Sequence, residues 1–404
     1  MIELWLYGTR LAKINDAGAG RSRLTYLGDA IDRWGLGSRI LTVSAPLVTT
    51  TLTPAPTAAI VEGLLPEGDA LNRLKVVFDI SHPAQLLGVI GRESVGAVIA
   101  LPEGEAIPST PTTEMPILSE GDVAARLRGL PQAPLGVSPE TSVRLSLAGA
   151  QPKLPLSRLA DGALRDPTIA RPSTIILKLE PSGWPRLVEL EAYGLAIMNE
   201  AGLPIPEYRI AEFEGIKVLE VERYDRIAES NGTMSRIHQE DLCMAVGARP
   251  DEKYATSPRS KTALSHMARA VYDNSREPDR DLGRFVTALV ANVAIGNCDA
   301  HARNYSLIHW EDGSIELAPI YDVVPTYHYP SLERHLAQPI NVDVLRPERV
   351  TREHLTAELD TWRVPNIGRI LRDSLQSVEA ALKTVPPPES PELEVLFARQ
   401  RLFT

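Results

Sequence analysis

Hydrophobic and polar positions alternate along this chain with two periods, and each period predicts one kind of element. Between residues 281 and 295, apolar side chains recur at the i, i+3, i+4, i+7 spacing of one helical face. The members of this face are Leu282, Phe285, Val286, Leu289, Val290 and Val293. Gly296 follows directly, and glycine commonly ends a helix. The pattern therefore predicts a buried helix over 281–295.

Shorter runs of alternating or β-branched apolar residues predict strands. These runs cover residues 1–8, 23–27, 95–101, 143–147, 173–179, 217–225 and 315–321. Helices are predicted at 57–65, 84–90 and 187–201, with a helix start at 239–246 and one or two helices within 355–382. The segments 45–56 and 102–116 are rich in Pro and Thr, which favours loops.

The same pattern divides the chain into three predicted domains. The first covers residues 1–130 and carries no pattern that indicates catalysis. The second covers residues 131–225, opens with a linker at 131–140 and contains mainly predicted strands. The third covers residues 226–404 and contains mainly predicted helices. Candidate chemistry therefore has to come from the second and third domains.

Charge and cysteine content narrow the class of protein. The 52 acidic residues outnumber the 42 basic ones, which argues against direct binding to nucleic acid, since affinity for phosphate backbones comes from clustered Lys and Arg. Cys243 and Cys298 are the only cysteines, too few for a disulfide framework or a metal-ligand cluster. The first eight residues lack the basic segment of a signal peptide, and no apolar run approaches transmembrane length. We therefore expect a cytoplasmic protein with no membrane partner.

The most informative pattern follows the predicted helix 281–295. Asp299 and Asn304 are five positions apart in one loop, and Asp322 follows the predicted strand 315–321. Phosphoryl transfer from ATP needs an Asp that orients the attacking hydroxyl, and an Asn and a second Asp that hold Mg²⁺ on the phosphates. Each residue alone is more often a helix cap or a turn residue. Taken together, the three predict an ATP- and Mg²⁺-dependent kinase.

A turn of small residues upstream has the character of a phosphate-binding loop. It comprises Ala148, Gly149, Ala150, Gln151, Pro152 and Lys153. Small residues let backbone N–H groups approach phosphates closely. A plain hairpin turn is the alternative interpretation, because the same residue types are common there.

Lys178 stands near the end of the predicted strand 173–179 and is a candidate phosphate ligand. In kinases, a lysine at this place contacts the α- and β-phosphates and pairs with a glutamate on the following helix. The helix predicted at 187–201 supplies such glutamates, and Glu191 is the partner we choose. The alternative is a lysine that simply marks an edge or surface of the sheet.

Six motifs, in order over about 180 residues, resemble the HipA family, the serine/threonine-kinase toxins of bacterial toxin–antitoxin pairs. They are S-L-A-G-A-Q-P-K at 146–153, I-L-K at 176–178, E-R-Y-D at 222–225, R-I-H-Q-E-D at 236–241, G-N-C-D-A-H-A-R-N-Y-S at 296–306 and L-A-P-I-Y-D at 317–322. The resemblance implies an α+β fold, a divergent two-lobed protein-kinase-like fold. It further implies an additional small N-terminal α/β domain and a mostly helical C-terminal lobe.

The resemblance also implies roles for individual residues. Asp299 is similar to the catalytic aspartate, and Asn304 and Asp322 to the magnesium ligands. Glu222 and Tyr224 would contact adenine through their backbones. The family's mobile phosphate loop corresponds to 148–153, and its phosphate-binding lysine to Lys178. His301 matches a residue near the nucleotide, although a structural histidine that fixes the loop is an equally good interpretation.

Ser146 matches a serine that the family autophosphorylates, which expels the phosphate loop and silences the kinase. A phosphate dianion beside the ATP phosphates would be repelled, which gives this switch a physical basis. The alternative is an ordinary strand serine. Two departures from the family are Pro152, where Glu is frequent, and Cys298, where Thr is common. Neither removes a group that catalysis requires, so we expect activity.

Three functions remain open. The first is a serine/threonine protein kinase toxin that phosphorylates a translation component such as an aminoacyl-tRNA synthetase, so that growth arrest gives dormancy and drug tolerance (persistence). The second is a catalytically weak corepressor held by a HipB-like DNA-binding antitoxin, with DNA bound only through that partner. The third is a small-molecule kinase similar to the aminoglycoside or choline kinases. The intact set of Lys178, Asp299, Asn304 and Asp322 favours the first function.

Overall fold

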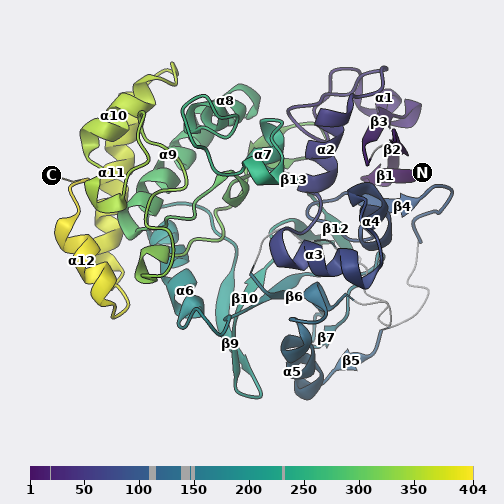
Figure 1. Cartoon of the computed structure of the whole chain (residues 1–404), viewed down its shortest axis with the longest axis horizontal. Coiled ribbons are helices and arrows are strands. Elements are labelled where there is room, and N and C mark those ends of the chain that lie inside the picture. The colour runs from purple at the N-terminus through teal and green to yellow at the C-terminus, as the bar shows by residue number, and fades with distance from the viewer. Residues whose placement is uncertain (19, 109–114, 138–145, 147–150, 230–232, 404) are drawn as a thin grey trace. The chain divides into compact units, whose positions relative to one another are not determined.

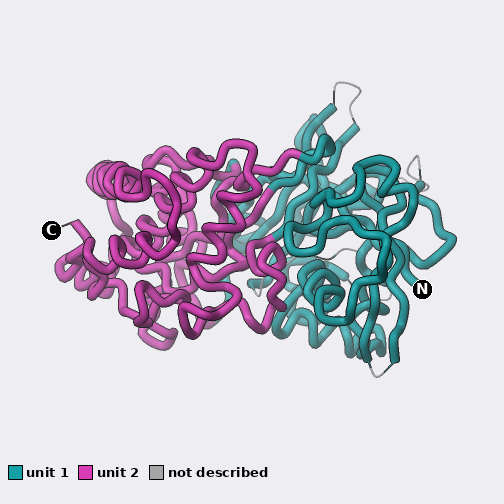
Figure 2. The backbone as a smooth tube through the Cα atoms, turned by 90° about the horizontal axis from the view of Figure 1, so that it is seen from above, with its two compact units in different colours: residues 1–182, 207–240, 308–313 teal, residues 183–206, 241–307, 314–404 magenta. Residues whose placement is uncertain are grey.

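The computed structural model describes residues 1–18, 20–108, 115–137, 146, 151–229 and 233–403. The chain forms two compact units (Figure 2). Unit 1 comprises residues 1–182, 207–240 and 308–313, and unit 2 comprises residues 183–206, 241–307 and 314–404. Strands and helices are mixed along the chain, and the fold is α+β (Figure 1).

Unit 1 begins with a four-stranded antiparallel sheet in the order β3-β2-β1-β4. The strands are β1 (Ile2–Leu6), β2 (Thr9–Asp16), β3 (Ser22–Tyr26) and β4 (Ile99–Pro102). The helices are α1 (Gly28–Trp34), α2 (Pro54–Gly63), α3 (Gly68–Val77) and α4 (Pro83–Ile90). Leu4 and Leu6 of β1 share one apolar core with Leu86 and Leu87 of α4, so burial of these side chains holds helix to sheet.

A second, six-stranded sheet of unit 1 has the order β5-β7-β6-β8-β10-β9. Its strands are β5 (Ile117–Leu118), β6 (Lys153–Arg158), β7 (Leu164–Arg165), β8 (Ile175–Leu179), β9 (Tyr208–Phe213) and β10 (Ile216–Glu222). Helix α5 (Glu120–Gly129) begins at a capping box formed by Ser119 and Asp122. Its Val123 and Leu127 pack on Leu154 and Leu177 of the sheet.

Two smaller sheets complete the strands. One is the antiparallel pair of β11 (Arg226–Ala228) and β12 (Met234–Arg236). A three-stranded sheet has the order β13-β14-β15, with β13 (His238–Asp241), β14 (Ser306–His309) and β15 (Ile315–Leu317).

Unit 2 is built around helix α9 (Pro278–Ile295), in which every residue from Phe285 to Ile295 is buried. The other helices are α6 (Leu187–Glu200), α7 (Leu242–Ala245), α8 (Leu264–Asn274), α10 (Arg352–Asp360), α11 (Ile367–Thr384) and α12 (Pro391–Arg399). Helices α6, α8, α11 and α12 all contact α9. Among the described residues, no helix combines the length and the apolar character needed to cross a membrane.

Most predicted elements are confirmed, and the differences lie at their ends. The segment 239–246 was predicted to start a helix, but β13 continues to Asp241, whose side chain then caps the short helix α7 by accepting from the N–H of Met244. The strand predicted at 95–101 starts only at Ile99, after Gly96 turns with a positive φ of 73°. The strand predicted at 315–321 ends at Leu317, two residues before Pro319. Of the strand predicted at 143–147, only Ser146 is described.

Candidate active site

The loop that carries Asp299 begins where helix α9 ends, at Gly296. Gly296 adopts the left-handed conformation, with φ 74° and ψ 37°. A Cβ atom at this position would lie 2.6 Å from Cδ2 of Leu396 and 2.8 Å from Cβ of Tyr327. Both the backbone conformation and the close packing therefore require glycine here. Gly296 therefore sets the direction in which the chain leaves helix α9 and where the loop begins.

Buried amide side chains hold the first turn of the loop. Nδ2 of Asn297 donates to Oδ1 of Asn292 at 2.9 Å, and Nδ2 of Asn292 donates to the hydroxyl of Tyr305 at 2.9 Å. Oδ1 of Asn297 in turn accepts from the backbone N–H of Asp299 at 3.1 Å. These hydrogen bonds connect helix α9, through Asn292, with Asn297, Asp299 and Tyr305 of the loop. The backbone of Asp299 is therefore attached to a rigid element.

Asp299 and Asn304 lie at the two ends of one tight loop. The backbone carbonyl of Asp299 accepts from Nδ2 of Asn304 at 2.8 Å and from the N–H of His301 at 2.8 Å. Asn304 is buried, whereas the Asp299 side chain is exposed. The carboxylate of Asp299 thus faces solvent while its backbone is fixed, as a group that must receive an acceptor hydroxyl requires.

Tyr321 brings Asp322 to the same loop. The hydroxyl of Tyr321 donates to the carbonyl of Arg303 at 2.9 Å and lies 2.6 Å from Oγ of Ser306. Asp322 follows Tyr321 directly and takes a positive φ of 57°, which is uncommon for a residue other than glycine. Such strain concentrates at functional sites. Tyr321 is thus bonded to the carbonyl of Arg303, and the next residue after each of these two is a predicted magnesium ligand, Asp322 and Asn304.

Asn304 and Asp322 suit a magnesium ion by their chemistry. The amide nitrogen of Asn304 is engaged with Asp299, which directs its oxygen elsewhere. An amide oxygen and a carboxylate are hard oxygen ligands, and Mg²⁺ keeps several waters and phosphate oxygens besides one or two protein ligands. In the described part of the chain, no group of three or more His, Cys, Asp or Glu side chains forms a metal cage. The residues therefore fit a metal shared with a bound nucleotide better than a permanent structural metal.

In unit 1, two of the predicted phosphate ligands stand opposite each other. Lys153 of β6 pairs with Lys178 of β8 in the antiparallel register, and both side chains are buried. Cβ atoms of directly opposed residues lie about 4.5–5.5 Å apart, and like charges at this distance destabilise a sheet. Two buried lysines paired across neighbouring strands would suit a polyanion such as a triphosphate, and this role stays a prediction.

The described end of the predicted phosphate loop is tied to β8. Nε2 of Gln151 donates to the carbonyl of Leu179 at 3.2 Å, and the N–H of Leu179 donates to the carbonyl of Pro152 at 3.0 Å. Pro152 thus contributes its carbonyl, and its missing N–H costs no bond in this pairing. Ala148, Gly149 and Ala150 lie outside the described residues. Their role in binding phosphate stays a prediction.

Ser146 is buried against the N-terminal part of unit 1. Its hydroxyl donates to the carbonyl of Leu64 at 2.5 Å, and its N–H donates to the carbonyl of Glu93 at 2.7 Å. Only 1% of its surface is exposed. The hydroxyl is therefore inaccessible to any kinase while Ser146 stays in this buried position, which is called its seat below.

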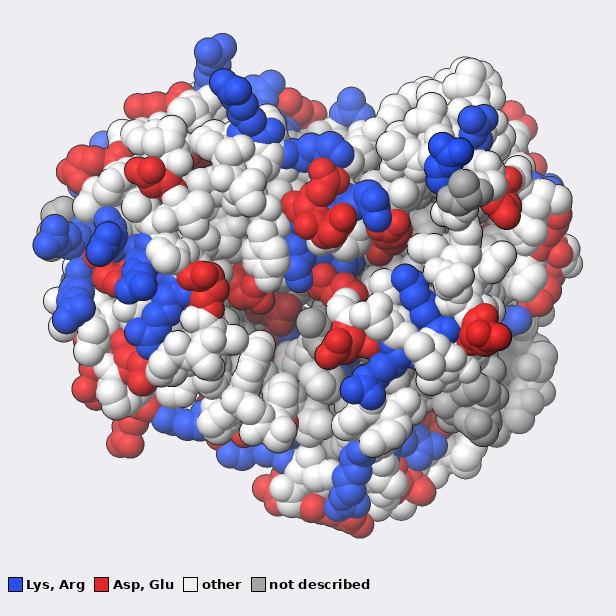
Figure 3. Space-filling model, in the orientation of Figure 1, with Lys and Arg blue, Asp and Glu red and all other residues white. Residues whose placement is uncertain are grey.

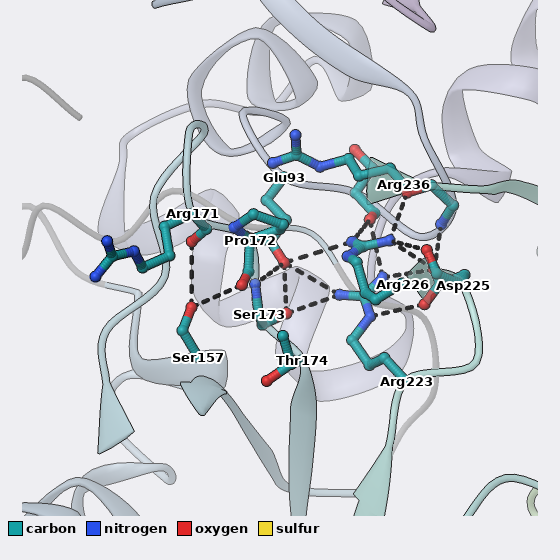
Figure 4. A network of polar contacts seen from close by, with 12 residues as sticks. Glu93, Ser157, Arg171, Pro172, Ser173, Thr174, Arg223, Asp225, Arg226 and Arg236 are labelled. Atoms are coloured by element: carbon teal, nitrogen blue, oxygen red, sulfur yellow. Dashed lines mark hydrogen bonds and ion pairs between the residues drawn. The ribbon is translucent and has the colours of Figure 1, made fainter. Parts of the chain in front are cut away.

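A buried ionic network fixes the segment predicted to contact adenine (Figure 4). Arg223 binds both oxygens of Asp225, at 2.9 and 2.7 Å, and reaches Oε1 of Glu93 at 3.2 Å. Arg226 lies 3.1 Å from Asp225 and 3.5 Å from Glu93. Burial alone would raise the pKa of Asp225, but Arg223 and Arg226 hold it well below its usual range. The network keeps the chain rigid beside Tyr224.

The predicted adenine contacts themselves flank this network. The N–H of Glu222 donates to the carbonyl of Glu207 at 2.8 Å, so this N–H is already engaged. The hydroxyl of Tyr224 donates to Oε1 of Gln239. Neither contact tests nucleotide binding, and both assignments stay predictions.

Glu191 and His301 lie in unit 2. Glu191 is buried on α6, whereas Lys178 belongs to unit 1, so their ion pair stays a prediction. The ring of His301 is buried and meets the ring of Tyr254 edge-on, with centroids 5.1 Å apart. This contact gives His301 a structural partner, and its contact with a nucleotide also stays a prediction.

Sequence reasoning missed Tyr254. Its hydroxyl donates to Oδ1 of Asp299 at 2.6 Å, although the two residues are 45 positions apart. Tyr254 lies in a segment with no regular pattern of apolar residues, and no spacing connects it to the catalytic loop. No sequence signal short of the folded structure would have found it.

An open pocket of about 800 Å³ lies at the C-terminal end of unit 2 and contains none of the predicted site residues. It is lined by Arg346, Glu348, Arg349, Ala398, Arg399, Gln400 and Arg401. Lys and Arg side chains gather over the C-terminal helices in this region (Figure 3).

Comparison with protein families decides which group of proteins this geometry belongs to. Residues 145–382 match the HipA-like C-terminal domain, and residues 2–101 match the HipA N-terminal domain. This chain belongs to the HipA family. The match to the C-terminal domain includes Ser146, both opposed lysines and the whole loop 296–306.

Individual relatives agree with this assignment. The HipA-family chain is 34% identical over 310 residues to the Sinorhizobium fredii protein named "Putative kinase Y4mE", covering 74% of this chain and 70% of that protein. It is 28% identical over 347 residues to the serine/threonine-protein kinase toxin HipA of Shewanella oneidensis, covering 81% and 78%. The structure of Shewanella oneidensis HipA in complex with HipB and its operator DNA matches with a TM-score of 0.78 and 25% identity, over 99% of this chain and 96% of that one.

Proposed function

We propose that this HipA-family chain is an ATP- and Mg²⁺-dependent serine/threonine protein kinase that acts as a growth-arresting toxin. The observation that carries the proposal is the rigidly held loop that presents the carboxylate of Asp299, with Asn304 bonded to its backbone and with Asp322 next in sequence to Tyr321, whose hydroxyl is bonded to the same loop. The opposed lysines Lys153 and Lys178 add a site for phosphates.

Each residue has a distinct task in the proposed reaction. Asp299 accepts a hydrogen bond from the serine or threonine hydroxyl, orients it toward the γ-phosphorus and takes its proton as the new P–O bond forms. The bond from the γ-phosphorus to the bridging oxygen breaks, and ADP leaves with the electron pair. Lys178 and Lys153 offset the charge of the phosphates. Asn304 and Asp322 would hold Mg²⁺, which neutralises charge on the phosphate oxygens when bound.

The seat of Ser146 supports self-silencing by autophosphorylation. Its hydroxyl now donates to the Leu64 carbonyl. A phosphate in its place would set anionic oxygens against that carbonyl in a buried site, which is unfavourable on both counts. Phosphorylated Ser146 must therefore leave its seat, and residues 147–153 are attached to it. Because Ser146 is buried, we also expect its phosphorylation to require an opening step.

The relatives suggest the cellular role. The Shewanella oneidensis complex contains HipB and operator DNA, and we propose an equivalent HipB-like antitoxin as the partner of this chain, with DNA bound only through it. The proposed protein substrate is a translation component such as an aminoacyl-tRNA synthetase, and the proposed location is the cytoplasm. Loss of tRNA charging would arrest growth.

The test is to incubate purified wild-type protein and Asp299→Asn with Mg-ATP and to locate added phosphate by peptide mass spectrometry. We expect phosphate on Ser146 in the wild type and at least a hundredfold less in Asp299→Asn, because the base that orients the hydroxyl is lost. The wild type is first treated with a phosphatase, so that phosphate already on Ser146 does not mask the reaction.

Two results would contradict the proposal. Equal incorporation in both proteins would remove Asp299 from the reaction. No incorporation in either protein, with Ser146 unphosphorylated at the start, would remove the self-silencing step and favour the catalytically weak corepressor that binds the antitoxin.

A further inference from the structure

The carboxylate of Asp299 has one hydrogen-bond donor in the described part of the chain, and that donor is Tyr254. The hydroxyl of Tyr254 lies 2.6 Å from Oδ1. The distance is that of a charge-assisted O–H···O⁻ bond, which is about twice as strong as a bond between neutral groups. Tyr254 is 45% exposed, so it lies at the surface from which an acceptor would approach Asp299.

The structure attaches Tyr254 to the catalytic loop at its backbone and at its ring. The N–H of Ala302, within the loop, donates to the carbonyl of Lys253 at 3.2 Å. The ring of Tyr254 meets the ring of His301 edge-on at 5.1 Å and an angle of 82°. Nζ of Lys253 lies 5.2 Å from the centroid of the Tyr254 ring. The position of the hydroxyl is therefore set by the loop that it serves.

The bond from Tyr254 to Oδ1 restrains the orientation of the Asp299 carboxylate. The exposed Asp299 side chain would otherwise rotate among its rotamers, and each rotation would move both oxygens. Holding Oδ1 fixes the plane of the carboxylate and leaves Oδ2 to receive a hydroxyl. A general base works only when it lies within hydrogen-bond reach of the proton it accepts.

We infer that Tyr254 is a positioning residue that fixes Asp299 so that its second oxygen faces the acceptor hydroxyl. The inference rests on the proposed kinase function and adds a residue to that site. In the alternative interpretation, the Tyr254 hydroxyl occupies the position where the substrate hydroxyl would bind Asp299, so Tyr254 competes with the substrate. The two interpretations predict opposite effects when the hydroxyl is removed.

The experiment compares Tyr254→Phe with Tyr272→Phe, a control at a half-buried tyrosine of helix α8. Both changes are made in a Ser146→Ala background, so that the enzyme cannot modify its own Ser146. The acceptor is a synthetic peptide with the sequence of residues 138–154, which contains Ser146. Steady-state rates with Mg-ATP give kcat and the KM values for peptide and ATP.

A positioning role predicts that Tyr254→Phe lowers kcat about ten- to hundredfold, the loss expected for one hydrogen bond to a charged group. The KM for ATP stays within twofold, because the hydrogen bond that Tyr254→Phe removes is made to Asp299, which orients the acceptor hydroxyl and not the nucleotide. The melting temperature and the Tyr272→Phe kinetics stay unchanged. An unchanged or higher kcat in Tyr254→Phe would overturn the inference and assign Tyr254 as a competitor of the substrate.

A spectroscopic readout separates this inference from the proposed function. With ¹³Cζ-labelled tyrosine, Asp299→Asn should move the Tyr254 resonance and leave that of Tyr272 in place. If neither the peptide nor the wild-type protein is phosphorylated, the kinase proposal fails, and the resonance still reports whether the Tyr254–Asp299 bond exists. An unmoved Tyr254 resonance would overturn the inference even in an active kinase.

Discussion

Single residues of this chain carry out functions that their neighbours cannot replace. Gly296 turns the chain out of the buried helix α9, and Oδ1 of Asn297 holds the backbone of Asp299 by accepting a hydrogen bond from its N–H. His238 plays a different part, because it is a fully buried histidine whose Nε2 lies 2.8 Å from the carbonyl of Leu41. Such a group is neutral in the folded protein and titrates when the protein unfolds.

His238 gives the first prediction on stability. Burial, helped by nearby His309, lowers the pKa of His238 from 6.5 to about 3. Between these values the unfolded chain binds a proton that the folded chain does not, so stability falls as the pH falls below 6.5. We expect a loss of about 1 kcal/mol between pH 7 and pH 5.5, measured by urea unfolding.

The control variants separate this effect from other titrations. His238→Gln retains a donor for the Leu41 carbonyl but has no proton to gain, so the loss between pH 7 and 5.5 should shrink. His266→Gln, at an exposed histidine of α8, should keep the wild-type loss. An identical pH dependence in His238→Gln and wild type would show that His238 is not the group responsible.

At the scale of elements, the close approach of helix α6 to a neighbouring segment affects where Asp322 lies. Gly194, in the middle of helix α6, touches the backbone beside Asp322. A Cβ atom at Gly194 would lie 2.0 Å from the carbonyl oxygen of Val323. Real Cβ atoms do not approach backbone oxygens to this distance, so the glycine allows the segment of Asp322 to lie against the helix. Asp322 precedes Val323 in this segment and has a left-handed backbone, with φ 57°.

We therefore predict that Gly194→Ala displaces the segment of Asp322. The displacement should cost about 1–3 kcal/mol of stability, as overpacking commonly does. It should also weaken Mg²⁺ binding, so that phosphate transfer needs a higher Mg²⁺ concentration. Titration of activity with Mg²⁺ and thermal melting would measure the two effects.

Gly283→Ala is the matched control, because Gly283 lies in helix α9 with open space around its Cα. This change should stabilise the protein slightly, by up to about 1 kcal/mol, since alanine favours helix more than glycine does. If Gly194→Ala had the same melting temperature and the same Mg²⁺ titration as Gly283→Ala, close packing of α6 would not determine the position of Asp322.

At the scale of the whole molecule, one buried network binds the N-terminal part of unit 1 to the sheet that carries the lysines. Glu93 follows α4, Ser173 precedes β8, and Arg223 follows β10. Oε1 of Glu93 accepts from the N–H of Ser173 at 2.8 Å and from Arg223 at 3.2 Å. The carbonyl of the same residue holds Ser146. Fold stability and the proposed switch therefore share one residue.

Removing Glu93 should be costly. Glu93→Ala would leave the buried guanidinium groups of Arg223 and Arg226 with Asp225 as their remaining acidic partner, and breaking a buried ion pair costs about 3–5 kcal/mol. We expect the melting temperature of unit 1 to fall by about 6–20 °C. Autophosphorylation of Ser146 should also become faster, because its seat is loosened.

Glu103→Ala is the control for this change, because Glu103 forms a partly exposed ion pair with Lys13. Ion pairs in contact with solvent contribute little to stability, so the melting temperature should hardly change. Equal melting temperatures of the two variants would show that the network around Glu93 does not hold the parts of unit 1 together.

The sequence determined part of the elements, helix α9 among them, and the candidate residues of one loop. The 3.6-residue period of 281–295 and its terminal glycine depend on neighbours along the chain, so helix α9 and the position of its loop could be predicted. The spacing of Asp299 and Asn304 is likewise a local property, because both belong to one loop. Element ends were less accurate, since caps such as Asp241 and turns such as Gly96 were outweighed by the apolar pattern.

Only the tertiary structure decided which distant residues meet. Lys153 and Lys178 face each other because β6 and β8 pair in one register, and Tyr254 reaches Asp299 because a loop 45 residues away packs on it. The burial of Ser146 depends on carbonyls of Leu64 and Glu93, more than 50 positions earlier. Local patterns reflect the periodicity of a helix or strand, whereas these contacts depend on how whole elements pack, which no short window of sequence contains.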